Sequence, residues 1–340
     1  MAKIVDWDTR IGGRIRLRDL HILLTVVQCG SMAKAASQLR VSQPAVSEAI
    51  AGLEHVLDVR LLDRGRRGVV PTVYGTALLR SGRAAFDELR QGIKQIEFLS
   101  DSTAGELRIA CPESISSGIL GPIIKMMSER YPRVRLFVEP FLFSARPLFP
   151  QLDNREVDLV FTRPSTPIRH NDFSVEILFN DRIRLAVGKN GPWARRRKID
   201  LAELVDELWI AVPSDDIGGL VLSEAFRARG IAAPRITVTT YSVHLRHSLA
   251  ATARFIAAVP ESVLRFNSGD LHELPVDLPT PAWPVAIVMP KDRTLSPVVD
   301  RFIECAREVV RSVRDKPVAG TGRNIKTRGA NGTQAARRAQ

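Results

Sequence analysis

The stretch that decides the fold of the first part of this chain is Leu20–Leu57, LHILLTVVQCGSMAKAASQLRVSQPAVSEAIAGLEHVL. Apolar residues recur in it at i, i+3, i+4 and i+7, the spacing of one face of an α-helix. Gly30 breaks the first run, and Ser31 and Ser42 are suitable N-caps for two further helices. Pro44 is tolerated in the first turn of the third helix. The pattern predicts three short helices, which form either a simple bundle or a helix-turn-helix.

The third helix has two different sides. Its inward stripe is apolar and consists of Val46, Ile50, Leu53 and Leu57. Its other side carries short or hydrogen-bonding groups, namely Gln43, Pro44, Ser47, Glu48 and Ala51, and Ser42 at its start is a further candidate DNA-binding residue. Such a face suits the major groove of DNA, because donors and acceptors read base edges at close range. We expect Gln43 and Ser47 to face base edges, Pro44 to contact a thymine methyl, and Glu48 to influence specificity.

A β-wing is predicted directly after the third helix. Residues 59–72 read as two short strands around a basic turn flanked by glycines. We expect Arg64, Arg66 and Arg67 to contact phosphates beside the groove. The alternative is a solvated basic turn without a role in binding.

A dense, collinear set of residues extends from the second helix past the wing. It consists of Ser31-Met32-x2-Ala35-Ala36-x2-Leu39-x2-Ser42-Gln43-Pro44-Ala45-Val46-Ser47, Leu53-Glu54, Leu61-Leu62-Asp63-Arg64, Pro71-Thr72 and Gly75. This set strongly resembles the N-terminal domain of LysR-type transcriptional regulators. Met32 and Leu62 stand where that family usually has phenylalanine, so apolar volume is kept. Asp58 stands where glycine is common, at a helix end that favours a left-handed residue.

A long helix is predicted from Thr72 to about Leu99, a stretch without proline. Leu79, Phe86, Leu89, Ile93 and Ile96 are spaced as an a/d seam, which needs a partner. The resemblance supplies one, the same helix of a second subunit, so that a dimer or tetramer reads two half-sites. The alternative is that the helix packs on its own C-terminal domain.

Beyond a linker at Asp101–Gly105, strand and helix patterns alternate, which predicts a parallel α/β architecture. The expected strands are Leu107–Cys111, Val134–Glu139, Val157–Phe161, Ile183–Val187, Trp209–Val212, Ile236–Thr239, Phe255–Val259 and Val285–Val288. The expected helices are Ile119–Arg130, Leu201–Leu208, Leu220–Arg229, Val243–Ala251 and Pro297–Val313.

This region resembles the effector-binding domain of the same regulators, a two-lobed fold like that of periplasmic binding proteins. The residues that carry the resemblance are Gly105-Glu106-Leu107-Arg108-Ile109, Val157-Asp158-Leu159-Val160 and Ala257-Ala258-Val259-Pro260. The expected organisation is multidomain. It comprises an all-α winged helix-turn-helix (1–72), a linker helix (73–101), an effector domain (102–315; lobe I 102–180 and 265–315, lobe II 181–264) and a basic disordered tail (316–340). By analogy, the chain crosses between lobes near Phe179–Arg182 and again near Pro260–Arg265.

In such folds a ligand lies between the lobes, at the carboxyl ends of strands. We expect Ser114, Ser144 and Arg163 to contact the effector, with Arg163 pairing with a carboxylate. Serines before helices are often only caps, and Arg163 could instead form a surface ion pair. Glu113 opposes an anionic ligand unless it is paired or points away. A further departure from the family is Ala253-Arg254-Phe255, where a glycine-rich turn is common.

Composition limits the class of protein. The 340 residues carry a net charge of +12, which suits a polyanionic partner. Three cysteines without CxxC spacing predict neither a disulfide framework nor a metal site, and we expect Cys29 and Cys305 to be buried. No secretory signal or membrane span is visible, so a cytoplasmic protein is expected.

The sequence therefore predicts a transcription factor that is not an enzyme and needs no cofactor. Its expected partners are double-stranded promoter DNA with an interrupted inverted repeat, a small effector for which an anion is one candidate, a second copy of itself, and RNA polymerase. Two rival interpretations are a small-molecule binding protein of the periplasmic type and an architectural DNA-binding protein without a ligand.

Overall fold

The computed structural model describes residues 14–65, 68–141, 149–164, 168, 172–214 and 216–314. Arg66, Arg67, Ser144 and the tail 316–340 lie outside these residues, so the expectations for them stay predictions. Within the described residues no helix has both the length and the apolar character that crossing a membrane requires. The described residues form two compact units, one with those of 14–116, 120–180 and 283–307, and the other with those of 117–119, 181–282 and 308–314.

The first unit begins with the three predicted helices, α1 (Leu17–Cys29), α2 (Met32–Leu39) and α3 (Gln43–Leu57). Gly30 ends α1 in the left-handed conformation, with φ 62°. The Ser31 hydroxyl caps α2 by accepting a hydrogen bond from the Lys34 amide at 3.5 Å. Met32 and Leu62 are buried in the helical core, as their apolar volume suggests. Asp58 ends α3 in the left-handed conformation (φ 54°), which its charge does not prevent.

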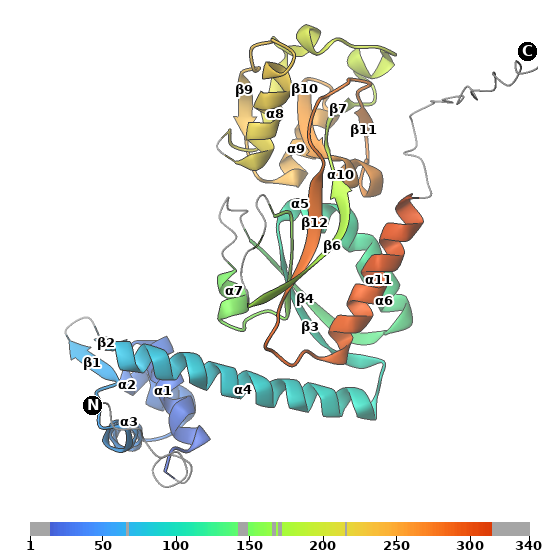
Figure 1. Ribbon diagram of the computed structural model, residues 1–340. Helices are drawn as coiled ribbons and strands as arrows, with labels where there is room; N and C mark the ends of the chain where they lie inside the picture. The colour runs from blue at the N-terminus through green and yellow to red at the C-terminus, as the bar shows by residue number, and fades with distance from the viewer. Residues whose placement is uncertain are drawn as a thin grey trace, which may run out of the picture. The chain divides into compact units, whose positions relative to one another are not determined.

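The wing and the long helix follow in the predicted order. Strands β1 (Leu62–Gly65) and β2 (Gly68–Pro71) pair antiparallel, and α4 (Val73–Ser100) extends for 28 residues (Figure 1). Thr72 caps α4 by accepting from the Gly75 amide at 3.0 Å. Gly75 is required because an added Cβ would lie 2.0 Å from the Leu61 carbonyl oxygen.

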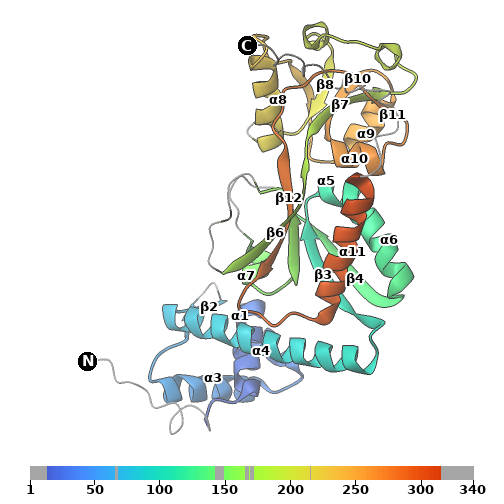
Figure 2. The same cartoon turned by 45° about the vertical axis from the view of Figure 1, so that its right-hand side comes forward.

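The α/β part of the first unit is a five-stranded sheet in the order β4-β3-β5-β12-β6. Its strands are β3 (Ala104–Cys111), β4 (Arg133–Pro140), β5 (Leu159–Thr162), β6 (Phe173–Asp181) and β12 (Trp283–Pro290). The helical segments are α5 (Glu113–Ile115), a π-turn (Ser116–Leu120), α6 (Gly121–Arg130), α7 (Pro150–Asp153) and α11 (Pro297–Arg314), of which residues 117–119 and 308–314 belong to the second unit. Helices α6 and α11 lie on the same side of this sheet (Figures 1 and 2). Phe302 of α11 meets Phe161 of β5 edge-on at 6.5 Å, and both are fully buried.

The second unit holds another five-stranded sheet, in the order β11-β7-β10-β8-β9. Its strands are β7 (Ile183–Gly188), β8 (Leu208–Ala211), β9 (Ile236–Thr239), β10 (Phe255–Pro260) and β11 (Leu271–Glu273). The helical segments are two 3₁₀ turns (Trp193–Arg195 and Leu201–Leu204), α8 (Ile217–Arg227), α9 (Val243–Ala251) and α10 (Glu261–Phe266). Trp209 anchors the core by packing edge-on against Phe226 at 5.5 Å.

Several expectations need correction. The sheets are mixed rather than parallel, because β12 runs antiparallel to β5 and β7 runs antiparallel to both β10 and β11. Strands β6 and β11 were not predicted, and the helix expected at Leu201–Leu208 is only a 3₁₀ turn that ends at Leu204. The linker is shorter than expected, since β3 begins at Ala104.

The chain leaves the first unit between Asn180 and Asp181, within the expected range, but returns only at Trp283 rather than near residue 265. The return is late because β11 first pairs with β7 of the second unit.

Candidate DNA-binding face and effector site

The outward side of α3 is formed as the sequence suggests. The Ser42 hydroxyl accepts a hydrogen bond from the Ala45 amide at 3.3 Å and so fixes the start of the helix. Val46 and Ile50 have no exposed surface, so their side of α3 is fixed inward. Gln43, Pro44 and Glu48 are exposed on the other side. This side of the helix is therefore available to a ligand.

Ser47 differs from its exposed neighbours. It is half-buried, and its hydroxyl donates to the sulfur of Met32 at 3.5 Å. This contact joins α3 to α2. Ser47 is thus less available to an external partner than the sequence suggested.

Glu54 joins α3 to the wing, a role that the sequence analysis did not predict. Its Oε1 accepts hydrogen bonds from the amides of Leu61 at 2.7 Å and Leu62 at 3.3 Å. The wing is held from its other strand as well, because the Val69 amide donates to the Gly30 carbonyl at 3.0 Å. Arg64 is exposed on β1 of the wing that these contacts fix.

In the first unit's α/β sheet, the ends of β3 and β5 bring two candidate effector residues together. Strands β3 and β5 are parallel neighbours, so their carboxyl ends lie at the same edge of the sheet. Ser114 follows β3, Arg163 follows β5, and Arg163 Nη1 donates to Ser114 Oγ at 2.7 Å. Arg163 is only 7% exposed, so it is a buried rather than a surface side chain.

Cys111, the last residue of β3, lies in the same neighbourhood. Burial raises the pKa of its thiol to about 11, and the charge of Arg163 opposes this only in part. A thiol with this pKa is not a reactive thiolate at neutral pH. Cys305 is also buried, as expected, but Cys29 is half-buried and its thiol donates to Gln38 Oε1 at 3.1 Å.

The serines after Ser114 include one with a purely local role. Ser116 is half-buried, and its hydroxyl donates to the carbonyl oxygen of Glu113 at 3.0 Å. This bond runs back to the first residue of α5, and Ser116 is the N-cap of neither α5 nor the π-turn that follows it.

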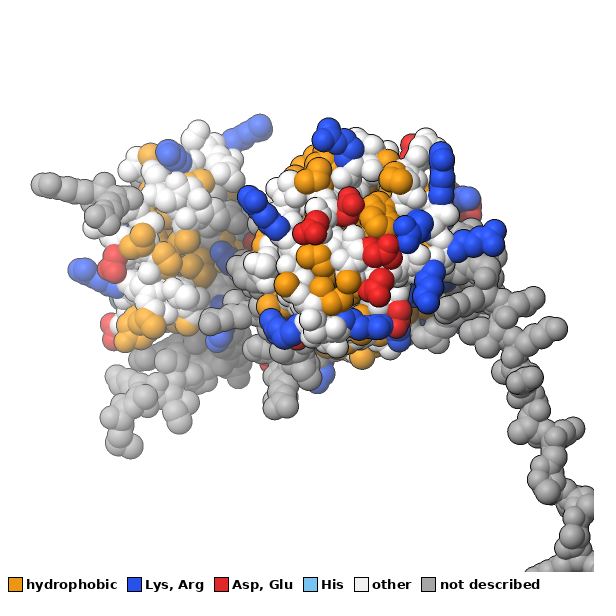
Figure 3. All heavy atoms as spheres, turned by 90° about the horizontal axis from the view of Figure 1, so that it is seen from above, with side chains coloured by type: hydrophobic (Ala, Val, Ile, Leu, Met, Phe, Trp, Pro, Cys, Tyr) orange, Lys and Arg blue, Asp and Glu red, His pale blue; other side chains and the backbone are white. Residues whose placement is uncertain are grey.

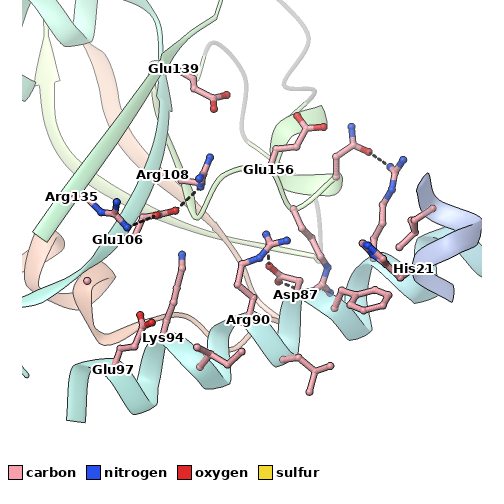
Figure 4. Close-up of a pocket in the computed structure, with 18 of the residues that line it drawn as sticks. His21, Asp87, Arg90, Lys94, Glu97, Glu106, Arg108, Arg135, Glu139 and Glu156 are labelled. Carbon is pink, nitrogen blue, oxygen red and sulfur yellow. Dashed lines mark hydrogen bonds and ion pairs between the residues drawn. The ribbon is translucent and has the colours of Figure 1, made fainter. Parts of the chain in front are cut away.

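An open groove of about 1370 Å³ in the first unit was not predicted. It is lined by side chains of α1, α4, β3 and β4, most of them charged (Figure 4). Many of these charges are already paired: Glu106 accepts from Arg108 at 2.9 Å and lies 3.6 Å from Arg135. No group of three His, Cys, Asp or Glu residues that could hold a metal ion occurs in the part of the chain that the structure describes.

The net charge of +12 is not gathered into one patch on the face shown in Figure 3. On the right-hand part of that view, acidic and apolar side chains lie near the middle, and Lys and Arg side chains lie around them. On this face, charge by itself therefore does not locate a binding surface.

Comparison with known protein families shows to which family this chain belongs. Residues 17–76 match the bacterial regulatory helix-turn-helix of the lysR family, and residues 100–311 match the LysR substrate binding domain. The second match alone covers more than half of the chain. The chain belongs to the LysR family. It is a transcriptional regulator with a DNA-binding helix-turn-helix and an α/β effector domain, and the resemblance seen in the sequence is confirmed.

Curated relatives of this LysR-family regulator are similar over most of its length. The transcriptional dual regulator GltC of Bacillus subtilis is 26% identical over 291 residues, which cover 85% of this chain and 96% of GltC. The regulator PcaQ of Agrobacterium fabrum is 26% identical over 311 residues, which cover 90% of this chain and 99% of PcaQ.

Solved structures share the fold. Full-length CbnR in complex with its target DNA has a TM-score of 0.60 at 21% identity and covers 87% of this chain and 100% of CbnR. A full-length OxyR variant from Pseudomonas aeruginosa has a TM-score of 0.59 at 19% identity and covers 87% of this chain and 95% of OxyR. The expected combination of a winged helix-turn-helix with a two-part α/β domain is therefore confirmed.

Proposed function

We propose that this LysR-family regulator responds to a small carboxylate held by Arg163 and Ser114. The observation that carries the proposal is the 2.7 Å hydrogen bond between these side chains at the shared edge of β3 and β5. A buried guanidinium offers several fixed donors to a carboxylate, and a charge-assisted bond is stronger away from water. Ser144, the third candidate, belongs to the same proposal and lies outside the described residues.

The DNA side of the proposal uses the exposed face of α3. Ser42, Gln43, Pro44, Ser47 and Glu48 would meet base edges, and Arg64, Arg66 and Arg67 would contact phosphates. A carboxylate beside DNA must accept from a cytosine amine or be held away from phosphate, so Glu48 would contribute to specificity.

Self-association through α4 completes the proposal. Leu89, Ile93, Ile96 and Leu99 are between 50% and 78% exposed, although such side chains favour burial. A second copy of α4 would cover them, and the resulting dimer or tetramer would bind an interrupted inverted repeat. The regulator would act in the cytoplasm, with RNA polymerase as a further partner.

The carboxylate proposal is tested by adding acetate, succinate and benzoate to the full-length protein, with acetamide, succinamide and benzamide as uncharged matches. We expect at least one acid to raise the melting temperature while its amide does not, because ligand binding to the native state stabilises it. Arg163→Lys should weaken that response, and Arg301→Lys, a change at an arginine whose side chain is 42% exposed, should not.

Equal responses to acid and amide, or a response that Arg163→Lys leaves intact, would contradict the carboxylate site. Calorimetric titration of the acids that shift the melting temperature gives their affinities directly. A flat response to a wider panel of acids would favour a DNA-binding protein without an effector.

A further inference from the structure

Helix α4 turns a polar face toward its own α/β sheet. Asp87, Gln91 and Lys94 follow one another at intervals of four and three residues and are 1%, 0% and 9% exposed. Two apolar side chains of the same helix, Ile93 and Ile96, are 58% and 65% exposed. This is the reverse of an ordinary surface helix, which buries its apolar face. The attachment of α4 to the sheet is therefore polar.

Arg293 is the centre of this attachment. Its Nε and Nη2 donate to the two carboxylate oxygens of Asp87 at 2.6 and 2.8 Å. Its Nη2 also reaches Asp158 Oδ1 at 3.2 Å, and its Nη1 donates to the carbonyl oxygen of Val157 at 2.6 Å. The side chains of Asp87, Asp158 and Arg293 are each only 2% exposed. We call these three side chains the buried ionic network.

Asp158 connects the network to the sheet and back to α4. One of its oxygens, Oδ2, accepts from the Arg108 amide of β3 at 3.0 Å and from Lys94 Nζ at 3.3 Å. The other oxygen accepts from Gln91 Nε2 at 3.2 Å. Among the described residues, Gln91 Oε1 is buried without a hydrogen-bond partner. The contact is thus extensive but not fully satisfied.

A further arginine reaches the network at a conformational cost. Arg155 Nη1 donates to Asp87 Oδ2 at 2.9 Å. Its backbone lies in the left-handed region, with φ 59°, a conformation that is unfavourable for a residue other than glycine. The residue with this unfavourable backbone conformation is thus the one whose guanidinium contacts Asp87 of α4.

Buried ion pairs are a weak way to hold two elements together. The desolvation cost of each charge offsets much of the attraction, and apolar side chains of similar size are often at least as stabilising. When such a contact separates, its charged groups regain water. A polar contact therefore suits an attachment that must open and close.

Strand β5 links this attachment to the candidate effector residues. Asp158 directly precedes β5, and Arg163 directly follows it. All four residues of β5 are buried, and five steps of strand span about 17 Å. A shift of Arg163 along the strand axis would therefore be transmitted through β5 to Asp158.

We infer that the buried ionic network of Asp87, Asp158 and Arg293 is a releasable attachment that couples the effector domain to α4 and thereby to the DNA-binding helices. The coupling to the effector residues rests on the proposed function of Arg163. The attachment of α4 to the sheet does not rest on that proposal, so the coupling and the attachment can be tested separately.

The attachment is tested without any ligand by pulsed electron paramagnetic resonance on the full chain. Spin labels are placed at Ser81→Cys of α4 and Glu129→Cys of α6, both exposed positions of the first unit, in a Cys29→Ser background. Labelled subunits are diluted into unlabelled ones, so that distances within one subunit dominate. We expect Asp87→Asn and Arg293→Gln each to broaden or shift the distance distribution.

Matched controls and a neutral double variant complete this experiment. Glu97→Gln, at an exposed position, and Arg301→Gln, at a half-buried position whose side chain is 42% exposed, remove the same charges, and the distribution should stay as in the parent protein. The double variant Asp87→Asn/Arg293→Gln leaves neither member of that pair charged and buried alone, which protects the fold. If this folded double variant keeps the parent distribution, the attachment is contradicted.

The coupling is tested in a second arm with acetate, succinate and benzoate. In the parent protein, an acid that binds should change the distance distribution and the affinity for DNA selected from a random pool. In the double variant, the acid should still bind but change neither property. An unchanged response would contradict the coupling. Absence of binding in the parent would contradict the carboxylate proposal, while the first arm would still decide the attachment.

Discussion

Arg293 and Asp87 lie 206 residues apart in the chain, yet two nitrogens of the guanidinium donate to both carboxylate oxygens at 2.6 and 2.8 Å. The pair joins the segment before α11 to the middle of α4. Both side chains are buried, so water does not weaken the interaction as it would at the surface. The long helix is therefore part of the first unit and not merely a connector to it.

Glu54→Gln should loosen the wing. The change weakens two hydrogen bonds from backbone amides to a charged acceptor, and bonds of this kind contribute about 1.5–3 kcal/mol each. Because glutamine can still accept, we expect a loss of about 1–2 kcal/mol in the free energy of unfolding of the N-terminal helices. Urea denaturation of the variant measures this loss, with Glu48→Gln, at an exposed position of the same helix, as the control. Equal stability of the two variants would contradict the role of Glu54.

Ala253→Gly should stabilise the second unit. Ala253 has φ 61°, a conformation that glycine adopts without strain. Relief of that strain, reduced by the greater freedom of glycine in the unfolded chain, gives an expected gain of about 0.5–1 kcal/mol. Ala253 begins the segment Ala253-Arg254-Phe255, where the LysR resemblance leads us to expect a glycine-rich turn.

Thermal unfolding measures the effect of Ala253→Gly. Ala251→Gly, at the last helical residue of α9, is the matched change and should have the opposite sign, because glycine is less favourable than alanine in a helix. A loss of stability in both variants would show that the strain at Ala253 is not significant.

Cys111 should remain a protonated thiol at physiological pH. Burial raises its pKa from 9.0 to about 11, so the folded protein holds the proton more tightly than the unfolded chain. This contribution to stability is complete below pH 9 and is lost as the pH rises toward 11. Cys111→Ala should therefore lose less stability than the parent protein over that interval.

The same property predicts slow chemical modification of Cys111. At pH 8 a thiol-specific reagent should modify half-buried Cys29 in the native protein, and Cys111 only after denaturation. Mass spectrometry of the labelled peptides distinguishes these sites. Rapid modification of native Cys111 would contradict its raised pKa.

Ile93→Lys should disrupt self-association. Ile93 is 58% exposed on the apolar face of α4, and a charge there would be desolvated in an interface between two copies. Sedimentation velocity should show a shift toward monomer for Ile93→Lys. Gln95→Lys, at a nearby exposed position, should keep the parent distribution. If both variants sediment like the parent protein, α4 is not the association surface.

Local patterns were sufficient to predict the N-terminal helices and the wing. The spacing of Val46, Ile50 and Leu53 and the caps at Ser31 and Ser42 act within a few residues, so they can be read directly from the sequence. Strand β6 was missed because its burial does not alternate regularly, and β11 because it has only three residues. The late return of the chain at Trp283 depends on the pairing of β11 with β7, which is a tertiary property.

The candidate effector residues Ser114 and Arg163 could be selected because both follow predicted strands. Their side chains touch because β3 and β5 are neighbours in the sheet, and no local sequence pattern predicts that pairing. The buried ionic network was not predicted for a similar reason. Asp87, Gln91 and Lys94 do have helical spacing, but a polar stripe is ordinarily the solvated side of a helix. The stripe faces inward because Arg293 binds Asp87, and because Asp158 binds Gln91 and Lys94.

The direct test of the account is whether α3 reads DNA sequence. A DNA site is first selected from a random pool with the full-length protein. Fluorescence anisotropy then measures the affinities of Gln43→Ala and Arg64→Ala for this site and for its single-base variants. Gln43→Ala should cost about 1–3 kcal/mol on the selected site and relax the preference at one base position. Arg64→Ala should weaken binding to all sequences alike and lower the salt dependence by about one ion. Unchanged affinity and base preference in Gln43→Ala would contradict the account.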